Sequence, residues 1–207
     1  GCDFPLVPGY ENIGEVIEPG DGVSLKPGDV IFHTGSNFTG DFCKCWGAQQ
    51  EFTIINEDSA FAVPEDLDPK DGVYGHVGAI ALRGIKRAKV TAEDTVAVVG
   101  LGLIGHLAAQ SAKAFGATVI GVDMDPKRLE YAKAAGIDYQ VNASEEDVKS
   151  KVFEYSNGGV TVAVDVTGIA STIPGTADLV HEMLWAPPYP AAPRILILGS
   201  YTDPIVL

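Results

Sequence analysis

The order of apolar and polar positions divides the chain into two parts of different character. Up to about residue 70, short apolar runs are separated by turns rich in proline and glycine, which is typical of a small β-rich unit. The expected strands are 13–17, 29–33, 51–55 and 60–63. A helical pattern over about 71–88 follows them. We therefore expect a β-rich domain over residues 1–75 and a second domain over residues 76–207.

From residue 95 onward, strand and helix patterns alternate. The expected strands are 96–99, 118–122, 139–141, 161–166 and 195–198. The first expected helix ends near residue 115. Further helices are expected over 126–135 and 145–155 and near 172–185. The strands are apolar throughout, as in sheets covered on both faces, and the alternation predicts a doubly wound parallel sheet with right-handed crossovers. Two mononucleotide halves need about six strands, and the first residues begin inside a β-rich unit without an obvious opening strand, so we expect the chain to be incomplete at both ends.

A glycine-rich turn follows the first strand of this second domain. Gly100, Gly102 and Gly105 stand between an apolar, β-branched strand and a helical pattern. The first glycine permits a tight turn, the second lets the backbone approach a pyrophosphate, and the third lets the helix pack against the strand. The amides of the first helical turn, which includes Leu103, Ile104 and Gly105, would then face the phosphates, where the helix dipole favours negative charge. The turn predicts a dinucleotide-binding fold.

Asp123 ends the second strand of this domain and indicates which cofactor binds. A carboxylate at this place accepts hydrogen bonds from the ribose hydroxyls of NAD and repels the additional phosphate of NADP. NAD is therefore the expected cofactor. Lys127 and Arg128 follow closely and present an alternative: they could pair with that phosphate, or they could be solvated residues in the first turn of a helix.

Composition limits the classes of partner. The formal net charge of −14 disfavours nucleic acid and anionic membranes, and 46% hydrophobic residues support a proper core. No apolar run approaches the roughly 20 residues of a membrane span, and no basic leader is apparent. The cysteines Cys2, Cys43 and Cys45 are few and odd in number, which suits a reducing compartment. We expect a cytoplasmic protein that acts on a small molecule.

Further motifs combine with the glycine-rich turn. They are Val7-Pro-Gly-Tyr-Glu11, Lys26-Pro-Gly-Asp-Val30, Gly47-Ala-Gln-Gln-Glu-Phe52, Val63-Pro-Glu65 and Ala88-Lys-Val90. With them, nearly the whole chain resembles the medium-chain dehydrogenase/reductase superfamily, the zinc-type alcohol dehydrogenases and their relatives. The resemblance implies a GroES-like β domain and a Rossmann domain with the active site in the cleft between them. It also implies a homodimer or a homotetramer.

The chain departs from the zinc enzymes at their metal ligands. Where those enzymes carry a ligand histidine before a glutamate, this chain has Tyr10 before Glu11, and a further cysteine ligand position corresponds to Gly75, beside His76. A phenol replaces an imidazole poorly as a zinc ligand. The resemblance is therefore greatest to a zinc-independent branch that includes the bacteriochlorophyllide dehydrogenases, and a catalytic zinc ion is disfavoured.

A structural zinc ion is also not expected. Cys43 and Cys45 form one C-x-C pair, whereas a tetrahedral structural site needs four ligands. Two free, half-buried thiols are the alternative that the usual behaviour of cysteine favours.

Hydride transfer from an alcohol leaves a hydroxyl proton that a base must remove. If no metal serves, His76 or Tyr10 would exchange this proton, and Glu11 would occupy the place of the acidic residue behind the metal. Histidine is the residue type that titrates nearest neutral pH, which favours His76. The competing interpretation is that both residues have structural roles.

The resemblance further implies that Thr167, Gly168 and Gly199 line the nicotinamide half of the cofactor. Ligands of such sheets bind beyond the carboxyl ends of the strands, although the glycines could merely turn the chain. The sequence thus predicts an NAD-dependent oxidoreductase that interconverts an alcohol and a ketone or aldehyde. The alternatives are an NADPH-dependent double-bond reductase of the same superfamily and a dinucleotide-binding protein without catalysis.

Overall fold

The computed structural model describes residues 4–37, 43–44, 46–182 and 192–204, and of residues 43 and 44 only the backbone. Cys2, Cys45 and the side chain of Cys43 therefore lie outside the description. Contacts divide the chain into Gly1–His76 and Val77–Leu207, and each unit is treated by itself. None of the helices in the described ranges combines the length and apolar character needed to cross a membrane.

The first unit is built on a small antiparallel sheet in the order β2-β3-β5. Its strands are β2 (Asn12–Glu15), β3 (Val30–His33) and β5 (Ala60–Ala62). Two further strands, β1 (Leu6–Val7) and β4 (Cys43–Lys44), pair in parallel. A 3-10 turn, Glu57–Ser59, and a short helix, α1 (Pro69–Gly72), complete the unit, and the Asp68 carboxylate caps α1 by accepting a hydrogen bond from the Lys70 amide.

Two expectations for this part of the chain are wrong. No strand forms over 51–55, where the Asn37 amide donates to the Ile54 carbonyl and the side chains of Phe52 and Ile54 are more than half exposed. A β-branched run forms a strand only where a neighbouring strand takes its hydrogen bonds, and loop contacts take that place here. The single helix expected over 71–88 is instead α1 and, after a break, α2 (Gly75–Arg87).

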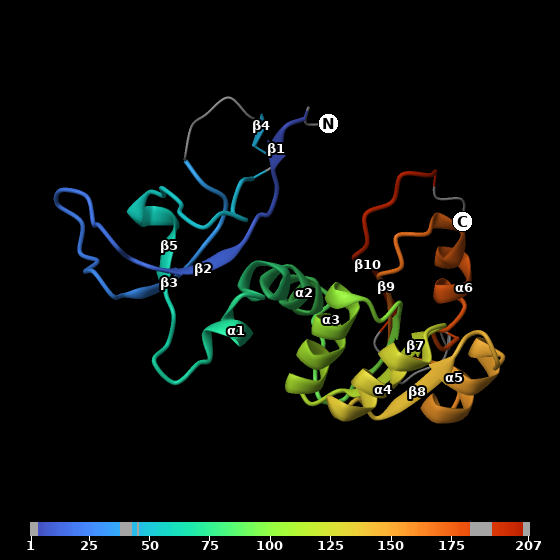
Figure 1. The fold of residues 1–207 in the computed structure, drawn as a ribbon. Helices are drawn as coiled ribbons and strands as arrows, with labels where there is room; N and C mark the ends of the chain where they lie inside the picture. The colour runs from blue at the N-terminus through green and yellow to red at the C-terminus, as the bar shows by residue number, and fades with distance from the viewer. Residues whose placement is uncertain (1–3, 38–42, 45, 183–191, 205–207) are drawn as a thin grey trace. The chain divides into compact units, whose positions relative to one another are not determined.

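The second unit contains a five-stranded, fully parallel sheet in the order β10-β9-β6-β7-β8 (Figure 1). Its strands are β6 (Thr95–Val99), β7 (Thr118–Asp123), β8 (Tyr139–Asn142), β9 (Val162–Asp165) and β10 (Arg194–Ile197). Within this sheet, β6 is the central strand. β7 and β8 follow on one side of β6, and β9 and β10 lie on its other side. The expected doubly wound sheet is confirmed, and its switch point lies between β6 and β9, where such sheets bind ligands.

Helices follow the strands of this unit, and two of them begin at acidic caps. The helical segments are α3 (Leu103–Ala114), α4 (Pro126–Ala134), α5 (Val148–Ser156), the 3-10 turn Ala170–Thr172 and α6 (Ile173–Ala177). The carboxylates of Asp125 and Asp147 cap α4 and α5 by accepting backbone hydrogen bonds. The long helix expected near 172–185 is wrong over its described part, because α6 ends at Ala177 and the His181 amide donates to the Val160 carbonyl. Residues 183–185 of that expectation lie outside the described residues.

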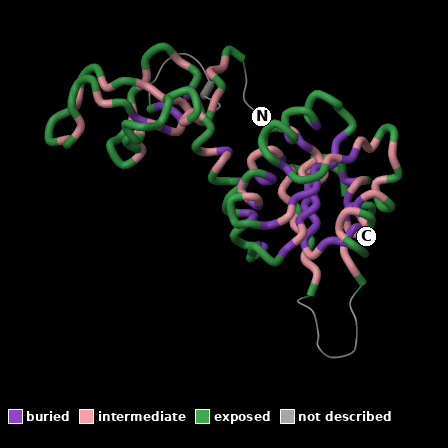
Figure 2. The backbone as a smooth tube through the Cα atoms, turned by 90° about the horizontal axis from the view of Figure 1, so that it is seen from below, coloured by how far each residue is buried: buried purple, intermediate pink, exposed green. Residues whose placement is uncertain are grey.

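The core of the second unit lies on both faces of the sheet. Alternate residues of a strand point to opposite faces, so Val96 and Val98 pack in one cluster with α2 and α3, whereas Ala97 packs in the other with Val152 of α5. Figure 2 shows the buried residues of this unit, in purple, concentrated in its middle. The core thus holds the strands rigidly and leaves their carboxyl ends to the connecting turns.

Candidate dinucleotide-binding site

The turn between β6 and α3 has the geometry that its glycines predict. Gly100 adopts φ of +91°, and its amide donates to the Val122 carbonyl at 2.9 Å. A Cβ atom on Gly105 would overlap the carbonyl oxygen of Gly100, whereas a Cβ atom on Gly102 would meet no atom within 4 Å. Gly102 supplies no side-chain cap to α3, so the first helical turn keeps amides that a bound anion could satisfy. This cradle fits a pyrophosphate.

Asp123 is bonded directly to this turn. Its Oδ2 accepts a hydrogen bond from the Leu101 amide at 2.6 Å, and its Oδ1 accepts one from the Asp125 amide at 2.9 Å. Burial alone would raise the pKa of Asp123, but the amides of Asp125 and Leu101 and the charge of Arg128 outweigh burial and hold the pKa below its ordinary value. Asp123 is therefore ionised at neutral pH, the state that accepts hydrogen bonds from ribose hydroxyls.

The two basic residues after β7 differ in their contacts. The Arg128 Nη1 atom lies 3.4 Å from Oδ2 of Asp123, and its Nε atom lies 3.9 Å from Oδ2 of Asp125. Lys127 is exposed, and its backbone amide contributes to the Asp125 cap. Arg128 thus lies beside the Asp123 carboxylate, which would meet either the ribose hydroxyl of NAD or the additional phosphate of NADP.

The turn after β9 lies against the glycine-rich turn on one side and against the turn after β10 on the other. A Cβ atom on Gly100 would lie 3.1 Å from the Thr167 amide nitrogen, and one on Gly199 would lie 3.0 Å from the Gly168 amide nitrogen. Gly168 itself adopts φ of +73°, and a Cβ atom on it would lie 3.3 Å from the Ser200 carbonyl oxygen. The structure therefore brings Thr167, Gly168 and Gly199 together with the glycine-rich turn at one edge of the sheet.

Asp165 lies at the same edge, although no motif in the sequence marks it. It ends β9, has no exposed surface, and accepts hydrogen bonds from three threonines and from Tyr201. The one signal in the sequence is an ionisable residue within the otherwise apolar run 162–166. The partners could not be inferred, because Tyr201 follows Asp165 by 36 residues.

Tyr10, Glu11 and His76 form a cluster in the first unit. The Glu11 Oε2 atom accepts a hydrogen bond from the His76 amide at 2.8 Å, and the rings of Tyr10 and His76 meet edge to face with centroids 5.3 Å apart. Trp46, which the sequence did not mark, packs edge to face on Tyr10 at 6.4 Å. Tyr10 is 38% exposed and Trp46 63%, so solvent reaches the cluster.

These donors do not fit a catalytic zinc ion. Across the described ranges, no group of three or more His, Cys, Asp and Glu side chains is placed to hold a metal ion. Around His76 the nearby groups are the phenol of Tyr10 and a Glu11 carboxylate that already accepts a backbone hydrogen bond. Catalytic zinc sites use three nitrogen, sulfur or carboxylate ligands from the protein, and this set supplies at most two of them, from His76 and Glu11.

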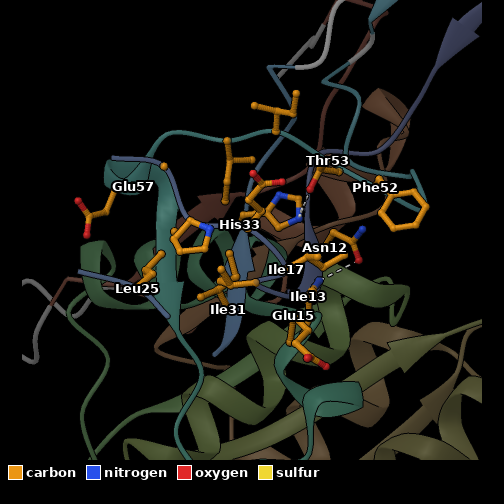
Figure 3. Close-up of a pocket in the computed structure, with 18 of the residues that line it drawn as sticks. Asn12, Ile13, Glu15, Ile17, Leu25, Ile31, His33, Phe52, Thr53 and Glu57 are labelled. Atoms are coloured by element: carbon orange, nitrogen blue, oxygen red, sulfur yellow. Dashed lines mark hydrogen bonds between the residues drawn. The ribbon is translucent and has the colours of Figure 1, made fainter. Parts of the chain in front are cut away.

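The first unit also contains a hollow of about 810 Å³. It is lined by β2, β3 and residues 50–55, and its lining does not include the cluster of Tyr10, Glu11 and His76. Figure 3 shows the imidazole of His33 beside Thr53, with Nε2 3.4 Å from the threonine hydroxyl and Nδ1 3.1 Å from the Gly35 carbonyl. Burial lowers the pKa of His33 more than the Gly35 carbonyl raises it, so this imidazole is neutral at pH 7.

A parallel sheet in this order, with a glycine-rich turn and an acidic residue after its second strand, defines a Rossmann-type nucleotide-binding protein. Comparison with protein families agrees. Residues 1–65 match the alcohol dehydrogenase GroES-like domain, and residues 104–183 match the zinc-binding dehydrogenase family. The chain belongs to the medium-chain dehydrogenase/reductase superfamily, as expected, and the GroES-like and Rossmann fold class is confirmed.

Individual relatives agree with this assignment. The (R,R)-butanediol dehydrogenase of Bacillus subtilis is 32% identical over 80% of this chain and 53% of its own length. A sorbitol dehydrogenase of Halalkalibacterium halodurans is 31% identical over 86% of this chain and 59% of its own length. A Sinorhizobium meliloti protein assigned to the zinc-binding dehydrogenases and solved with NADP superposes with a TM-score of 0.81 at 26% identity, over 100% of this chain and 65% of the other. The chain thus spans a little over half the length of its curated relatives.

Proposed function

We propose that the protein is an NAD-dependent alcohol dehydrogenase that interconverts an alcohol and a ketone or aldehyde. The observation that carries this proposal is the ionised carboxylate of Asp123, hydrogen-bonded to the Leu101 amide beside an open phosphate cradle. The butanediol and sorbitol dehydrogenases among its relatives support a small hydroxylated substrate. A cytoplasmic location and assembly into dimers or tetramers remain predictions.

In this proposal the residues of the second unit bind and orient the cofactor. Amides of the first turn of α3 face the pyrophosphate, Asp123 accepts hydrogen bonds from the adenosine ribose, and Thr167, Gly168 and Gly199 approach the nicotinamide half. NAD supplies the acceptor for the hydride, and the protein supplies position and exclusion of competing reactions. The close contacts between the three turns support a single site for the whole dinucleotide.

Cofactor preference is the first test of the proposal. Titration calorimetry of the full chain should give an affinity for NADH more than about tenfold higher than for NADPH, since the extra phosphate meets the Asp123 carboxylate. The NADP in the Sinorhizobium meliloti structure and the position of Arg128 favour the alternative, a double-bond reductase that uses NADPH. A tenfold preference for NADPH would therefore overturn both the alcohol assignment and the role of Asp123.

Proton exchange is assigned to the cluster in the first unit. His76 takes the proton from the substrate hydroxyl, Tyr10 packs against its ring, and Glu11 holds the backbone of His76 in place. Zinc is not part of this proposal. Metal analysis of the active full chain tests this point, and one equivalent of zinc that is lost together with activity on chelation would contradict it.

A second candidate function is dinucleotide binding without catalysis. It is favoured by Tyr10 at the place of an expected metal ligand and by the absence, within the described ranges, of a three-residue metal-binding group. A panel of secondary alcohols and ketones separates the two candidates. Binding of NADH without turnover of any member would favour the second one.

A further inference from the structure

The carboxylate of Asp165 occupies a central place in the second unit. Asp165 is the last residue of β9, and the register of the sheet sets it level with Val99 at the end of β6 and Ile197 at the end of β10. It has no exposed surface. The turns that follow these three strands are those that lie together at the candidate cofactor site, so Asp165 stands directly behind them.

The two carboxylate oxygens of Asp165 have different partners. Oδ2 accepts from the hydroxyls of Thr172 at 2.8 Å and Thr176 at 2.7 Å, which belong to the helical segment after β9. Oδ1 accepts from the amide of Thr167 at 3.0 Å, from its hydroxyl at 2.8 Å, and from the phenol of Tyr201 at 2.7 Å. One oxygen thus faces the helix, and the other faces the two turns of the cofactor site.

Ionisation of a fully buried carboxylate is costly unless hydrogen bonds satisfy it. Burial alone would raise the pKa of Asp165, but donors led by Thr176, Thr167 and Tyr201 reverse this and leave the pKa below its ordinary value. Burial and the same carboxylate raise the pKa of Tyr201 to about 12, so its phenol remains protonated and donates. The pair therefore keeps one fixed arrangement at neutral pH.

This arrangement fixes the distance between the two turns. The phenol of Tyr201 folds back over Gly199, where a Cβ atom would come within 2.7 Å of the phenol oxygen and 3.0 Å of the Gly168 amide nitrogen. Tyr201 belongs to the turn after β10, and Thr167 to the turn after β9. Asp165 joins them through Oδ1, and the phenol of Tyr201 also interacts directly with the Thr167 side chain and the Gly168 backbone.

We propose that Asp165 and Tyr201 are positioning residues of the cofactor site, which hold the Thr167–Gly168 turn against the Gly199–Ser200 turn so that both can approach the nicotinamide half of the dinucleotide. This inference rests on the proposed dinucleotide binding and adds two residues that would not touch the reacting atoms. It also gives the buried charge a role, because an apolar residue in this strand would accept no hydrogen bond from either turn.

The test compares two ligands that share the adenosine, pyrophosphate and second ribose. NADH carries the nicotinamide ring, and ADP-ribose lacks it. In the full chain, Tyr201→Phe removes only the phenolic oxygen and should weaken NADH binding about tenfold while leaving ADP-ribose affinity within about twofold. Asp165→Asn keeps the size of the side chain and one acceptor oxygen, and it should show the same selectivity for NADH.

A matched control lies at the opposite end of the same strand. The Thr161 hydroxyl donates to the buried carboxylate of Asp94 at 2.7 Å, the same kind of bond at the amino edge of the sheet. Thr161→Val should lower the thermal midpoint in a similar way and change the affinity for neither ligand. Calorimetry is performed well below the thermal midpoint of each variant, so that loss of folded protein does not imitate loss of affinity.

Each outcome decides a different question. Selective loss of NADH affinity in both Tyr201→Phe and Asp165→Asn supports the positioning role. Equal loss for both ligands, or no loss, overturns it while the proposed function stands. If the unaltered chain binds neither NADH nor ADP-ribose, the proposed function itself fails, and the positioning role fails with it.

Discussion

Replacing Gly105 by alanine tests the glycine-rich turn most directly. The new Cβ atom would overlap the carbonyl oxygen of Gly100 and lie 2.9 Å from its carbonyl carbon. Backbone atoms cannot rotate away as side chains do, so helix and turn must separate by a distance on the order of 1 Å. Overpacking of this kind costs about 1–3 kcal/mol of unfolding free energy, and a misplacement of about 1 Å can cost about a hundredfold in function.

Gly102→Ala is the informative contrast, because it separates stability from binding. No atom lies within 4 Å of the new Cβ atom, and φ of −66° suits alanine, so stability should change by less than about 0.5 kcal/mol. The methyl group would nevertheless enter the space assigned to the pyrophosphate. We expect NADH affinity to fall at least about tenfold, which corresponds to about 1.4 kcal/mol.

Chemical denaturation and titration calorimetry measure the two effects on the same samples. Gly175→Ala serves as the control, since this exposed glycine of α6 also has no atom within 4 Å of the added carbon. It should leave NADH affinity unchanged. Wild-type NADH affinity in Gly102→Ala would refute the placement of the phosphates, and wild-type stability in Gly105→Ala would refute the close packing of α3 on the turn.

Three further predictions concern single charged or titratable groups. Asp123→Ser should lower NADH affinity about tenfold and reduce the preference over NADPH, and calorimetry that shows an unchanged ratio would contradict the ribose contact. His76→Ala should slow turnover without changing NADH affinity, and an unchanged turnover rate would exclude His76 from proton exchange. The lowered pKa of Asp165 stabilises the fold fully above the unfolded-state pKa of about 4, and this contribution is lost as the pH falls from there through the lower folded-state pKa. Asp165→Asn should therefore unfold in less urea at pH 7 and lose less stability than wild type on acidification to about pH 3.

The second unit follows its local sequence closely. Short apolar runs specify strands buried on both faces, and acidic caps such as Asp125 and Asp147 set helix starts. Right-handed crossovers then leave few ways to order the strands. The expectations over 51–55 and 172–185 are wrong, because a strand needs a neighbouring strand and the chain after Ala177 pairs with Val160 in place of a longer helix.

The amino-acid sequence by itself determined the parallel sheet, the glycine-rich turn and the acidic residue beside it, since each depends on residues close together along the chain. Only the tertiary structure decided that Tyr201 reaches Asp165 across 36 residues and that His76 reaches Glu11 across 65. Patterns of polarity encode which residues are buried, but not which distant segments meet. A buried carboxylate acquires its role only when folding brings its hydrogen-bond donors to it.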